Sequence, residues 1–327
     1  MTKNAKNLCL KNLALKKGID IGVAVNNGYL NDKNYRKIIT REFNIVTPEY
    51  ELLFWPIHPF KNKYNFKLAD KVVSFAKRNK MKIRGHPLVW HKAVDRVGLP
   101  NWIIKGKFTR EEFIGILRDH IKTVMERYKG KINDWNVVNE AIDDNNKLRK
   151  GIWLKNIGPD YIEMAFRFAH ETDPKAKLYY NDYSIDDLNK KSDAVYRLIK
   201  KLLKKGVPIH GVGLQMHLLE EHLPEPQSVD KNIKRFKKLG LEVSITEMDV
   251  RIKKPVTQEK IENQARIYHE MLKTALRNKC NAFILWGVSD AHSWIPWVYK
   301  NYDAALIFDK NCKPKPAYEK LKEVLIQ

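Results

Sequence analysis

Two glutamates, Glu140 and Glu247, each close a short apolar run, "DWNVVNE" over 134–140 and "LEVSITE" over 241–247. Runs rich in β-branched residues are typical of strands that are buried on both faces. A carboxylate at the edge of such a dry interior is costly unless it has a partner or a task. The surrounding polar residues are Asn, Gln, His and Trp, whereas a hard-cation site gathers several carboxylates. The pattern favours a sugar-binding site, and we expect no metal ion and no cofactor.

Two facing carboxyl groups can cleave a glycosidic bond when one is protonated and the other is ionised. We expect donors such as Asn139 and His217 to hold Glu247 ionised, and the charge of Glu247 to favour a proton on Glu140. Glu140 then protonates the leaving oxygen while Glu247 attacks the anomeric carbon. A retaining mechanism requires about 5–5.5 Å between the two carboxyl groups, against roughly 6.5–9.5 Å for inversion.

Strand patterns alternate with helix patterns along the whole chain. Strand-like runs occupy 19–25, 43–47, 81–86, 134–140, 177–182, 210–215, 241–247 and 282–287. Amphipathic helix patterns begin near residues 32, 67, 109, 160, 190, 228, 257 and 316, and Thr109 with Glu112 forms a capping-box pattern. This alternation predicts an α/β fold, a (β/α)8 TIM barrel, as a single domain over residues 1–327. A doubly wound open sheet is the alternative, but no G-x-G-x-x-G motif opens a first helix.

In a (β/α)8 barrel the carboxyl ends of all strands meet at one mouth, where catalytic residues gather. Polar or aromatic residues lie at these ends on six of the expected strands: His86, Asn139, Glu140, Asn181, Asp182, Gln215, Glu247 and Trp286. The tryptophans Trp90, Trp286, Trp294 and Trp297 flank strand ends or the loops that follow. Aromatic faces of this kind stack on the apolar faces of pyranose rings.

The net charge of +23 would also suit a nucleic-acid-binding protein. However, the lysines are spread along the chain, and the densest group, Lys200–Lys205, forms the polar face of an amphipathic helix. We therefore interpret the lysine excess as a solvated surface and expect neither a nucleic-acid nor a membrane partner. An acidic polymer stays possible as substrate or partner.

Cysteine usage and the chain ends add little chemistry. Cys9, Cys280 and Cys312 form no C-x-x-C pair and no zinc-like spacing, so we expect free thiols. No apolar stretch reaches the roughly 18 residues of a membrane span. The basic N-terminus lacks the apolar core of a secretion signal. The protein either stays inside the cell or is secreted with a leader absent from this sequence; we favour the second.

Seven segments in order carry a resemblance to a known family. They are "RGHPLVWH" (84–91), "WNVVNEA" (135–141), "DPKAKLYYNDY" (173–183), "GVPIHGVGLQMHL" (206–218), "LEVSITEMDVR" (241–251), "LWGVSDAHSW" (285–294) and "KPKPAY" (313–318). Along nearly its whole length the chain resembles the endo-β-1,4-xylanases of glycoside hydrolase family 10. The resemblance implies a (β/α)8 barrel that cleaves β-1,4-linked xylan with retention of configuration and requires no cofactor.

The resemblance also implies roles for individual residues. Glu140 matches the acid/base and Glu247 the nucleophile of the family. His217 matches the partner of the nucleophile, braced by Asp249. Asn139 matches the residue that holds the 2-hydroxyl of the sugar on the glycone side of the scissile bond, and Tyr183 resembles an aglycone-side contact. Residues matching the glycone-side lining are Glu49, His86, Trp90, Gln215, Trp286 and Trp294.

The chain departs from the family pattern on the glycone side. After the second strand the family usually has T-P-E-N, two residues and Lys, but this chain reads "TPEYELL" over 47–53. Tyr50 and Leu53 thus replace an Asn and a Lys, and Ala93 stands where Gln is frequent. All three replaced positions normally donate hydrogen bonds to sugars. We therefore hypothesise remodelled glycone subsites, with stacking on Tyr50 as partial compensation.

Several alternatives stay open. Another β-linked or decorated glycan could be the preferred substrate, or the barrel could bind carbohydrate without cleaving it. Glu140 could be structural and pair with a lysine or arginine, and Glu49 could pair with Arg84 or a lysine. We expect the substrate to be xylan or xylo-oligosaccharides and the protein to act as a monomer.

Overall fold

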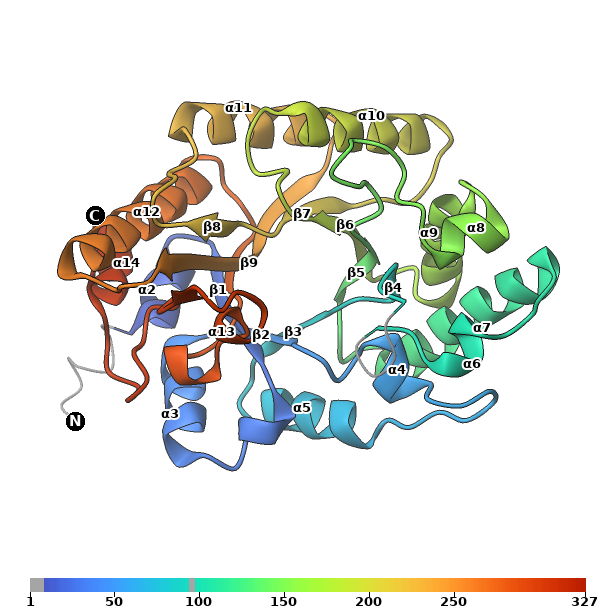
Figure 1. The fold of residues 1–327 in the computed structure, drawn as a ribbon, viewed down its shortest axis with the longest axis horizontal. Coiled ribbons are helices and arrows are strands. Elements are labelled where there is room, and N and C mark those ends of the chain that lie inside the picture. The colour runs from blue at the N-terminus through green and yellow to red at the C-terminus, as the bar shows by residue number, and fades with distance from the viewer. Residues whose placement is uncertain (1–8, 94–97) are drawn as a thin grey trace.

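The computed structural model describes residues 9–93 and 98–327, and within them eight parallel strands close into a barrel (Figure 1). The closure is made by β10, which pairs in parallel with both β1 and β9. The barrel strands are β1 Asp20–Val25, β2 Ile45–Pro48, β3 Lys82–Gly85, β5 Asp134–Asn139, β6 Lys177–Asp182, β7 Gly211–Leu214, β9 Glu242–Lys253 and β10 Ala282–Leu285. Every strand-like run predicted from the sequence corresponds to one of them, so the (β/α)8 prediction is confirmed.

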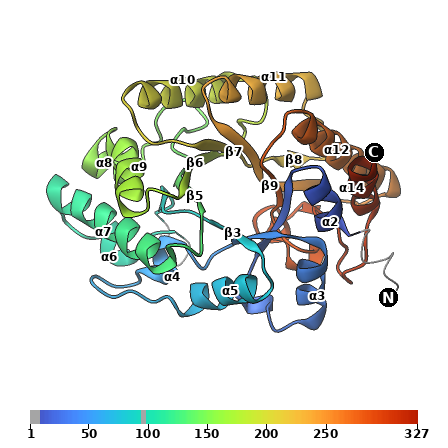
Figure 2. The same cartoon turned by 180° about the vertical axis from the view of Figure 1, so that it is seen from behind.

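Helices form a ring around these strands, as both views of the molecule show (Figures 1 and 2). Their amphipathic patterns place apolar residues toward the strands and lysines toward solvent. Thr109 and Glu112 make the predicted capping box at the start of α7. The eight predicted helices are α3 Lys33–Glu42, α5 Lys67–Arg78, α7 Arg110–Tyr128, α9 Tyr161–Thr172, α10 Lys190–Lys204, α11 Pro226–Lys237, α12 Gln258–Arg277 and α14 Pro316–Ile326.

Sequence patterns missed the shorter elements, because a single turn of helix or two residues of strand has too little periodicity to detect. The largest of them is α2, Leu10–Lys16, whose Leu10, Leu13 and Ala14 are buried and which packs on β1 and α14. The others are η1 Asn27–Tyr29, α4 Phe54–Ile57, β4 Val89–Trp90, α6 Asn101–Ile104, α8 Ile152–Ile157, β8 His217–Leu219, η2 Asp290–His292, α13 Ile295–Val298 and β11 Tyr302–Asp303.

The strand β9 continues well beyond its predicted end at residue 247. Its outer half pairs with β8, which sets His217 opposite Asp249, and with β11. Because side chains two residues apart on a strand share a face, Glu247 and Asp249 point the same way. The extension of β9 and the short strand β8 therefore bring both carboxylates to one histidine.

The interior of the barrel contains a buried cation. Arg84 on β3 is 1% exposed, and its guanidinium donates to Asn136 Oδ1 at 3.3 Å and Ser244 Oγ at 3.2 Å. The guanidinium carbon also lies 4.3 Å from the ring centroid of Tyr179. The alternative in which Arg84 pairs with Glu49 is not found: within the described residues, the carboxylate that pairs with Arg84 is Asp134, whose Oδ2 lies 3.9 Å from Nη2.

Within the described residues, no helix is long and apolar enough to cross a membrane. The three cysteines are free thiols, as expected, and Cys9 and Cys280 are buried. No group of three or more His, Cys, Asp or Glu side chains in the described ranges is placed to hold a metal ion.

Candidate active site

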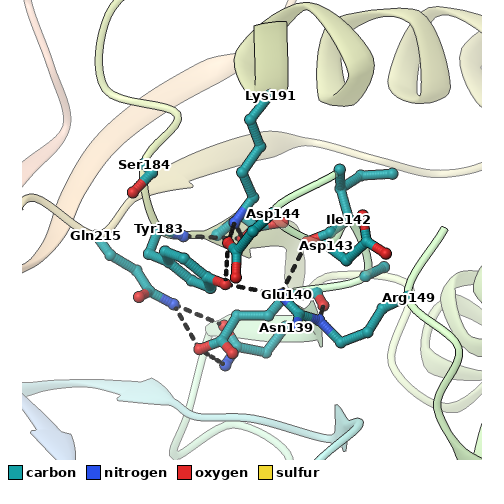
Figure 3. A network of polar contacts seen from close by, with 12 residues as sticks. Asn139, Glu140, Ile142, Asp143, Asp144, Arg149, Tyr183, Ser184, Lys191 and Gln215 are labelled. Atoms are coloured by element: carbon teal, nitrogen blue, oxygen red, sulfur yellow. Dashed lines mark hydrogen bonds and ion pairs between the residues drawn. The ribbon is translucent and has the colours of Figure 1, made fainter. Parts of the chain in front are cut away.

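A chain of amide side chains joins Glu140 to Glu247 across the barrel mouth. Asn139 Nδ2 donates to Glu140 Oε1 at 3.2 Å, and Asn139 Oδ1 accepts from Asn181 Nδ2 at 2.8 Å. The same Asn181 nitrogen donates to Glu247 Oε1 at 2.6 Å. Gln215 closes a second link, donating to both Asn139 Oδ1 and Glu140 Oε1 at 3.2 Å (Figure 3). The two glutamates predicted to work together thus belong to one hydrogen-bonded network.

Asn181, on β6, reaches Glu247 on β9 over the intervening strand β7. This is possible because the β7 residue in register with Asn181 is Gly213. A Cβ atom on Gly213 would lie 2.1 Å from Asn181 Oδ1. Thr246 Oγ1 donates to that oxygen at 2.7 Å, which fixes the amide with its NH2 group toward Glu247.

One expectation about Glu247 needs correction. Asn139 was predicted to donate to it, but Asn139 donates to Glu140, and Asn181 is the amide that holds Glu247. The reason is strand order. Asn139 lies on β5, with β6 and β7 between it and β9, whereas Asn181 lies on β6 and has only Gly213 of β7 to cross. Asn181 was noted as a polar strand end, but its role could not be assigned from sequence alone.

His217 lies between two carboxylates, as predicted. Its Nε2 is 3.3 Å from Glu247 Oε2, and its Nδ1 is 2.9 Å from Asp249 Oδ2. Burial opposes the charge of the ring, but Asp249 and Glu247 outweigh it and raise the pKa of His217 to about 10. Trp294 Nε1 donates to Asp249 Oδ2 at 2.8 Å and so holds the other end of the array. A charged imidazole donates from both nitrogens, so His217 orients the carboxylates of Glu247 and Asp249 at once.

His86 lies next to the other oxygen of Glu247, and its protonation state differs from that of His217. Its Nδ1 is 3.7 Å from Glu247 Oε1 and 2.9 Å from Asn136 Nδ2. Burial lowers the pKa of His86, more than the neighbouring carboxylates raise it. A neutral His86 accepts the Asn136 hydrogen bond at Nδ1 and carries its own hydrogen on Nε2.

Glu140 receives a further donor from the predicted site. Trp90 Nε1 donates to Glu140 Oε2 at 3.0 Å, so the two oxygens of this carboxyl contact different walls of the mouth. His91, which was not predicted as a site residue, has its Nδ1 3.8 Å from the same oxygen. Burial lowers the pKa of His91 to about 3, helped by the charge of Arg149. The groups that donate to the Glu140 carboxyl, Asn139, Gln215 and Trp90, are all neutral. This argues against the alternative in which Glu140 is a structural residue paired with a lysine or arginine.

Tyr183 lies beside Glu140 in a cluster of charged groups (Figure 3). Its hydroxyl donates to Asp144 Oδ1 at 2.5 Å and accepts from Arg149 Nη2 at 2.9 Å. Lys191 Nζ lies 3.1 Å from the centroid of the ring and 2.9 Å from Asp182 Oδ1. Arg149 and Lys191 were missed in the sequence because both come from segments outside the strand ends.

The glycone side carries the three departures from the family pattern. Leu53 is buried, and Ala93 is exposed and offers no donor. Tyr50 is 44% exposed, and its backbone N–H donates to Glu51 Oε2 at 3.2 Å. Burial, together with the charge of Glu51, raises the pKa of Glu49 to about 7.

Two tryptophans complete the predicted lining. Trp286 is 9% exposed and packs edge-on against His86, with ring centroids 5.1 Å apart. Trp294 packs in the same way against His217, also at 5.1 Å. Each tryptophan therefore contacts a histidine that lies next to Glu247. Trp297 is 85% exposed and has no such contact with the network, unlike Trp294.

Comparison with known proteins agrees with this geometry. The family model described as Glycosyl hydrolase family 10 matches residues 9–324. Endo-1,4-beta-xylanase B of Thermotoga neapolitana is 42% identical over 323 residues, which cover 97% of this chain and 91% of that protein. The crystal structure of xylanase 10B from Thermotoga petrophila in complex with xylobiose aligns with a TM-score of 0.94 at 44% identity, over 97% of each chain. Fold, site and whole-length similarity agree, and the chain belongs to glycosyl hydrolase family 10.

Proposed function

We propose that this chain is an endo-1,4-β-xylanase that cleaves xylan by double displacement with retention. The observation that carries the proposal is the network that joins Glu140 to Glu247 through Asn139 and Asn181. The related Thermotoga petrophila enzyme was crystallised with xylobiose, which supports a xylo-oligosaccharide as the ligand here.

In the first step, Glu247 attacks the anomeric carbon and Glu140 protonates the departing glycosidic oxygen. Asn181 and His217 orient the attacking carboxylate, while Trp90, Asn139 and Gln215 orient the acid. In the second step, Glu140 removes a proton from water, and that water releases the sugar from Glu247. Two inversions at one carbon give net retention.

The sugar-lining roles follow the same geometry. We propose that Glu49, His86, Trp286 and Trp294 contact the glycone and that Tyr183 contacts the aglycone.

Azide distinguishes the two glutamate roles. On an aryl β-xylobioside, Glu247→Ala should lose turnover, and azide should restore it with formation of the inverted α-glycosyl azide. Glu140→Ala should instead form the retained β-glycosyl azide, because the nucleophile is still present. Product configuration is read by NMR. Exchanged configurations would reverse the assignment, and unimpaired turnover in both variants would remove it.

We further propose that Tyr50, Leu53 and Ala93 weaken hydrogen bonding to linear xylan on the glycone side. A missing hydrogen bond to a sugar is worth about 0.5–1.5 kcal/mol, or roughly two- to twelve-fold in kcat/KM. Leu53→Lys and Ala93→Gln should therefore each raise kcat/KM on unbranched xylo-oligosaccharides. Wild-type kcat/KM that already equals that of a relative with the usual residues would contradict the remodelling.

A further inference from the structure

The backbone turns sharply at Glu140, which has a φ of +58°. In a regular strand, successive side chains point to opposite faces. Here the adjacent Asn139 and Glu140 both reach the mouth, since Asn139 Nδ2 donates to Glu140 Oε1. A left-handed conformation in a residue other than glycine persists only where its surroundings hold it.

The groups that hold this turn come from both sides of the peptide. The Glu140 N–H donates to the Asn181 carbonyl on β6 at 2.9 Å, and the next N–H, of Ala141, donates to the Tyr180 hydroxyl at 3.1 Å. The Glu140 carbonyl has left the sheet ladder, and such a group requires another donor. Arg149 supplies it, with Nε donating to the Glu140 oxygen at 2.9 Å.

Arg149 is brought to this position by a hairpin. Its own N–H donates to the Ala141 carbonyl at 2.8 Å, and Ile142 forms an antiparallel bridge with Leu148. From there Nη2 donates to the Ile142 carbonyl at 3.0 Å and to the Tyr183 hydroxyl at 2.9 Å (Figure 3). The guanidinium thus connects the backbone of the acid residue to the tyrosine of the aglycone wall.

We propose that Arg149 is a positioning residue for proton transfer, which fixes the backbone of Glu140 so that its carboxyl meets the glycosidic oxygen. The proposal rests on the proposed function, with Glu140 as the acid. A planar guanidinium suits the task, because three donors in fixed directions hold two carbonyls and one hydroxyl at once, and its charge strengthens each bond. Lysine offers a point charge without this fork.

The test compares a substrate whose leaving group must be protonated by Glu140 with one whose leaving group departs without a proton. Xylohexaose has a poor leaving group, whereas 2,4-dinitrophenyl β-xylobioside releases a phenolate without protonation. Arg149→Met should lower kcat/KM on xylohexaose by about 10²-fold, as expected for a small misplacement of a reacting group. Its kcat/KM on the dinitrophenyl substrate should stay near the wild-type value. Arg149→Lys should show the same difference between substrates with a smaller loss.

A second measurement examines the base role of Glu140. The hydrolysis of the glycosyl-enzyme also needs Glu140, so kcat of Arg149→Met on the dinitrophenyl substrate should fall and should rise again with azide. Azide needs no general base and replaces the water. A merely structural defect would lower every rate and show no azide response.

Arg167→Met is the matched control, since Arg167 makes similar contacts on the surface, to Glu163 Oε1 and the Lys205 carbonyl. It should behave as wild type on both substrates. Equal losses of Arg149→Met and Arg149→Lys on both substrates, or no loss on either, would overturn the positioning role. A different result would contradict the proposed function itself. If Glu140 is not the acid, Glu140→Ala should change kcat/KM on xylohexaose and on the dinitrophenyl substrate by the same factor.

Discussion

At the residue scale, His217 keeps a positive charge in a buried position. Burial alone would favour the neutral ring, yet Asp249 and Glu247 raise its pKa to about 10. The ring is therefore charged across the neutral range and loses its proton only as the pH rises through about 10. Asp249, which is fully buried and accepts a hydrogen bond from Trp294, supports this charge at Nδ1, the nitrogen away from Glu247.

Asp249→Asn tests this arrangement. Removing the carboxylate charge should lower the pKa of His217, so that the ring becomes neutral at lower pH. The pKa of His217, read from the NMR signals of its ring, should then move about one to three pH units lower. Asp230→Asn removes a carboxylate paired with Lys234, far from the histidine in the sequence, and should leave the pKa of His217 unchanged. An unshifted pKa of His217 in Asp249→Asn would show that the charge of the ring does not depend on Asp249.

Glu49 gives a prediction about stability. Its pKa is about 7 in the folded protein, against 4.5 as the ordinary value, because burial and Glu51 disfavour its charge. Folding thus favours the protonated form, and its stabilising effect is complete below pH 4.5 and is lost as the pH rises through about 7. Glu49→Gln removes this loss, on the order of 3 kcal/mol, because one pKa unit corresponds to about 1.4 kcal/mol.

Calorimetry at two pH values provides the measurement. The difference in Tm between Glu49→Gln and wild type should be more positive at pH 8 than at pH 5. Glu323→Gln, a change on the surface helix α14, should give a difference that is small at both pH values. A constant difference for Glu49→Gln would mean that this carboxyl ionises normally in the folded state.

At the element scale, the strand β7 has glycines where neighbouring strands carry large side chains. Its glycines leave space for side chains of the neighbouring strands: a Cβ on Gly211 would meet Tyr179, and a Cβ on Gly213 would meet Asn181. Inward-facing positions on adjacent barrel strands must share the same limited volume. A small residue on β7 is therefore the condition for a long amide to cross from β6 to β9.

Gly213→Ala should displace the Asn181 amide, since the added carbon would lie 2.1 Å from its oxygen. The expected result is a loss of kcat/KM on xylo-oligosaccharides of about 10²-fold, because Glu247 loses its oriented donor. Gly115→Ala is the matched control, with open space around its Cβ position on α7, and should keep full activity. Full activity in Gly213→Ala would show that the site tolerates movement of Asn181.

At the scale of the whole molecule, the surface is strongly basic, with 61 Lys and Arg against 38 Asp and Glu. Many of these lysines contact carboxylates at the surface, such as Lys82 with Asp20 and Lys234 with Asp230, each at 2.7 Å. Exposed pairs of this kind contribute only about 0–1 kcal/mol each. The net positive charge therefore contributes little to the stability of the barrel. Its larger effect is on which charged polymers the protein attracts.

Salt dependence separates a neutral substrate from a polyanion. Raising salt from about 50 to 200 mM weakens a protein with six to ten phosphate contacts by roughly 10³- to 10⁵-fold. Hydrolysis of uncharged xylohexaose should instead change little over the same range, because no counterions are released. A steep loss of xylanase activity with salt would contradict recognition through neutral hydroxyl groups.

Much of the fold could be read from the sequence, because parallel strands and amphipathic helices have periodic patterns. The barrel then places the ends of its strands together, so Glu140, Glu247, Gln215 and His86 could be assigned to one site. These assignments needed only the order of the elements. The short elements α2 and β8 were missed because packing, and not local periodicity, stabilises them.

Only the tertiary structure decided which side chains touch. Asn181 holds Glu247 because Gly213 leaves the path open, and Arg149 reaches the Glu140 carbonyl because a hairpin returns it there. The Arg149 contact joins residues 9 positions apart, and the Asn181 contact joins residues 66 positions apart. Their geometry depends on strand register and on the room left by neighbouring side chains. The sequence by itself determined the barrel and its two glutamates, since these follow from periodic burial. The orientation of those glutamates was decided by three-dimensional packing, because distance and direction between side chains are not properties of a one-dimensional pattern.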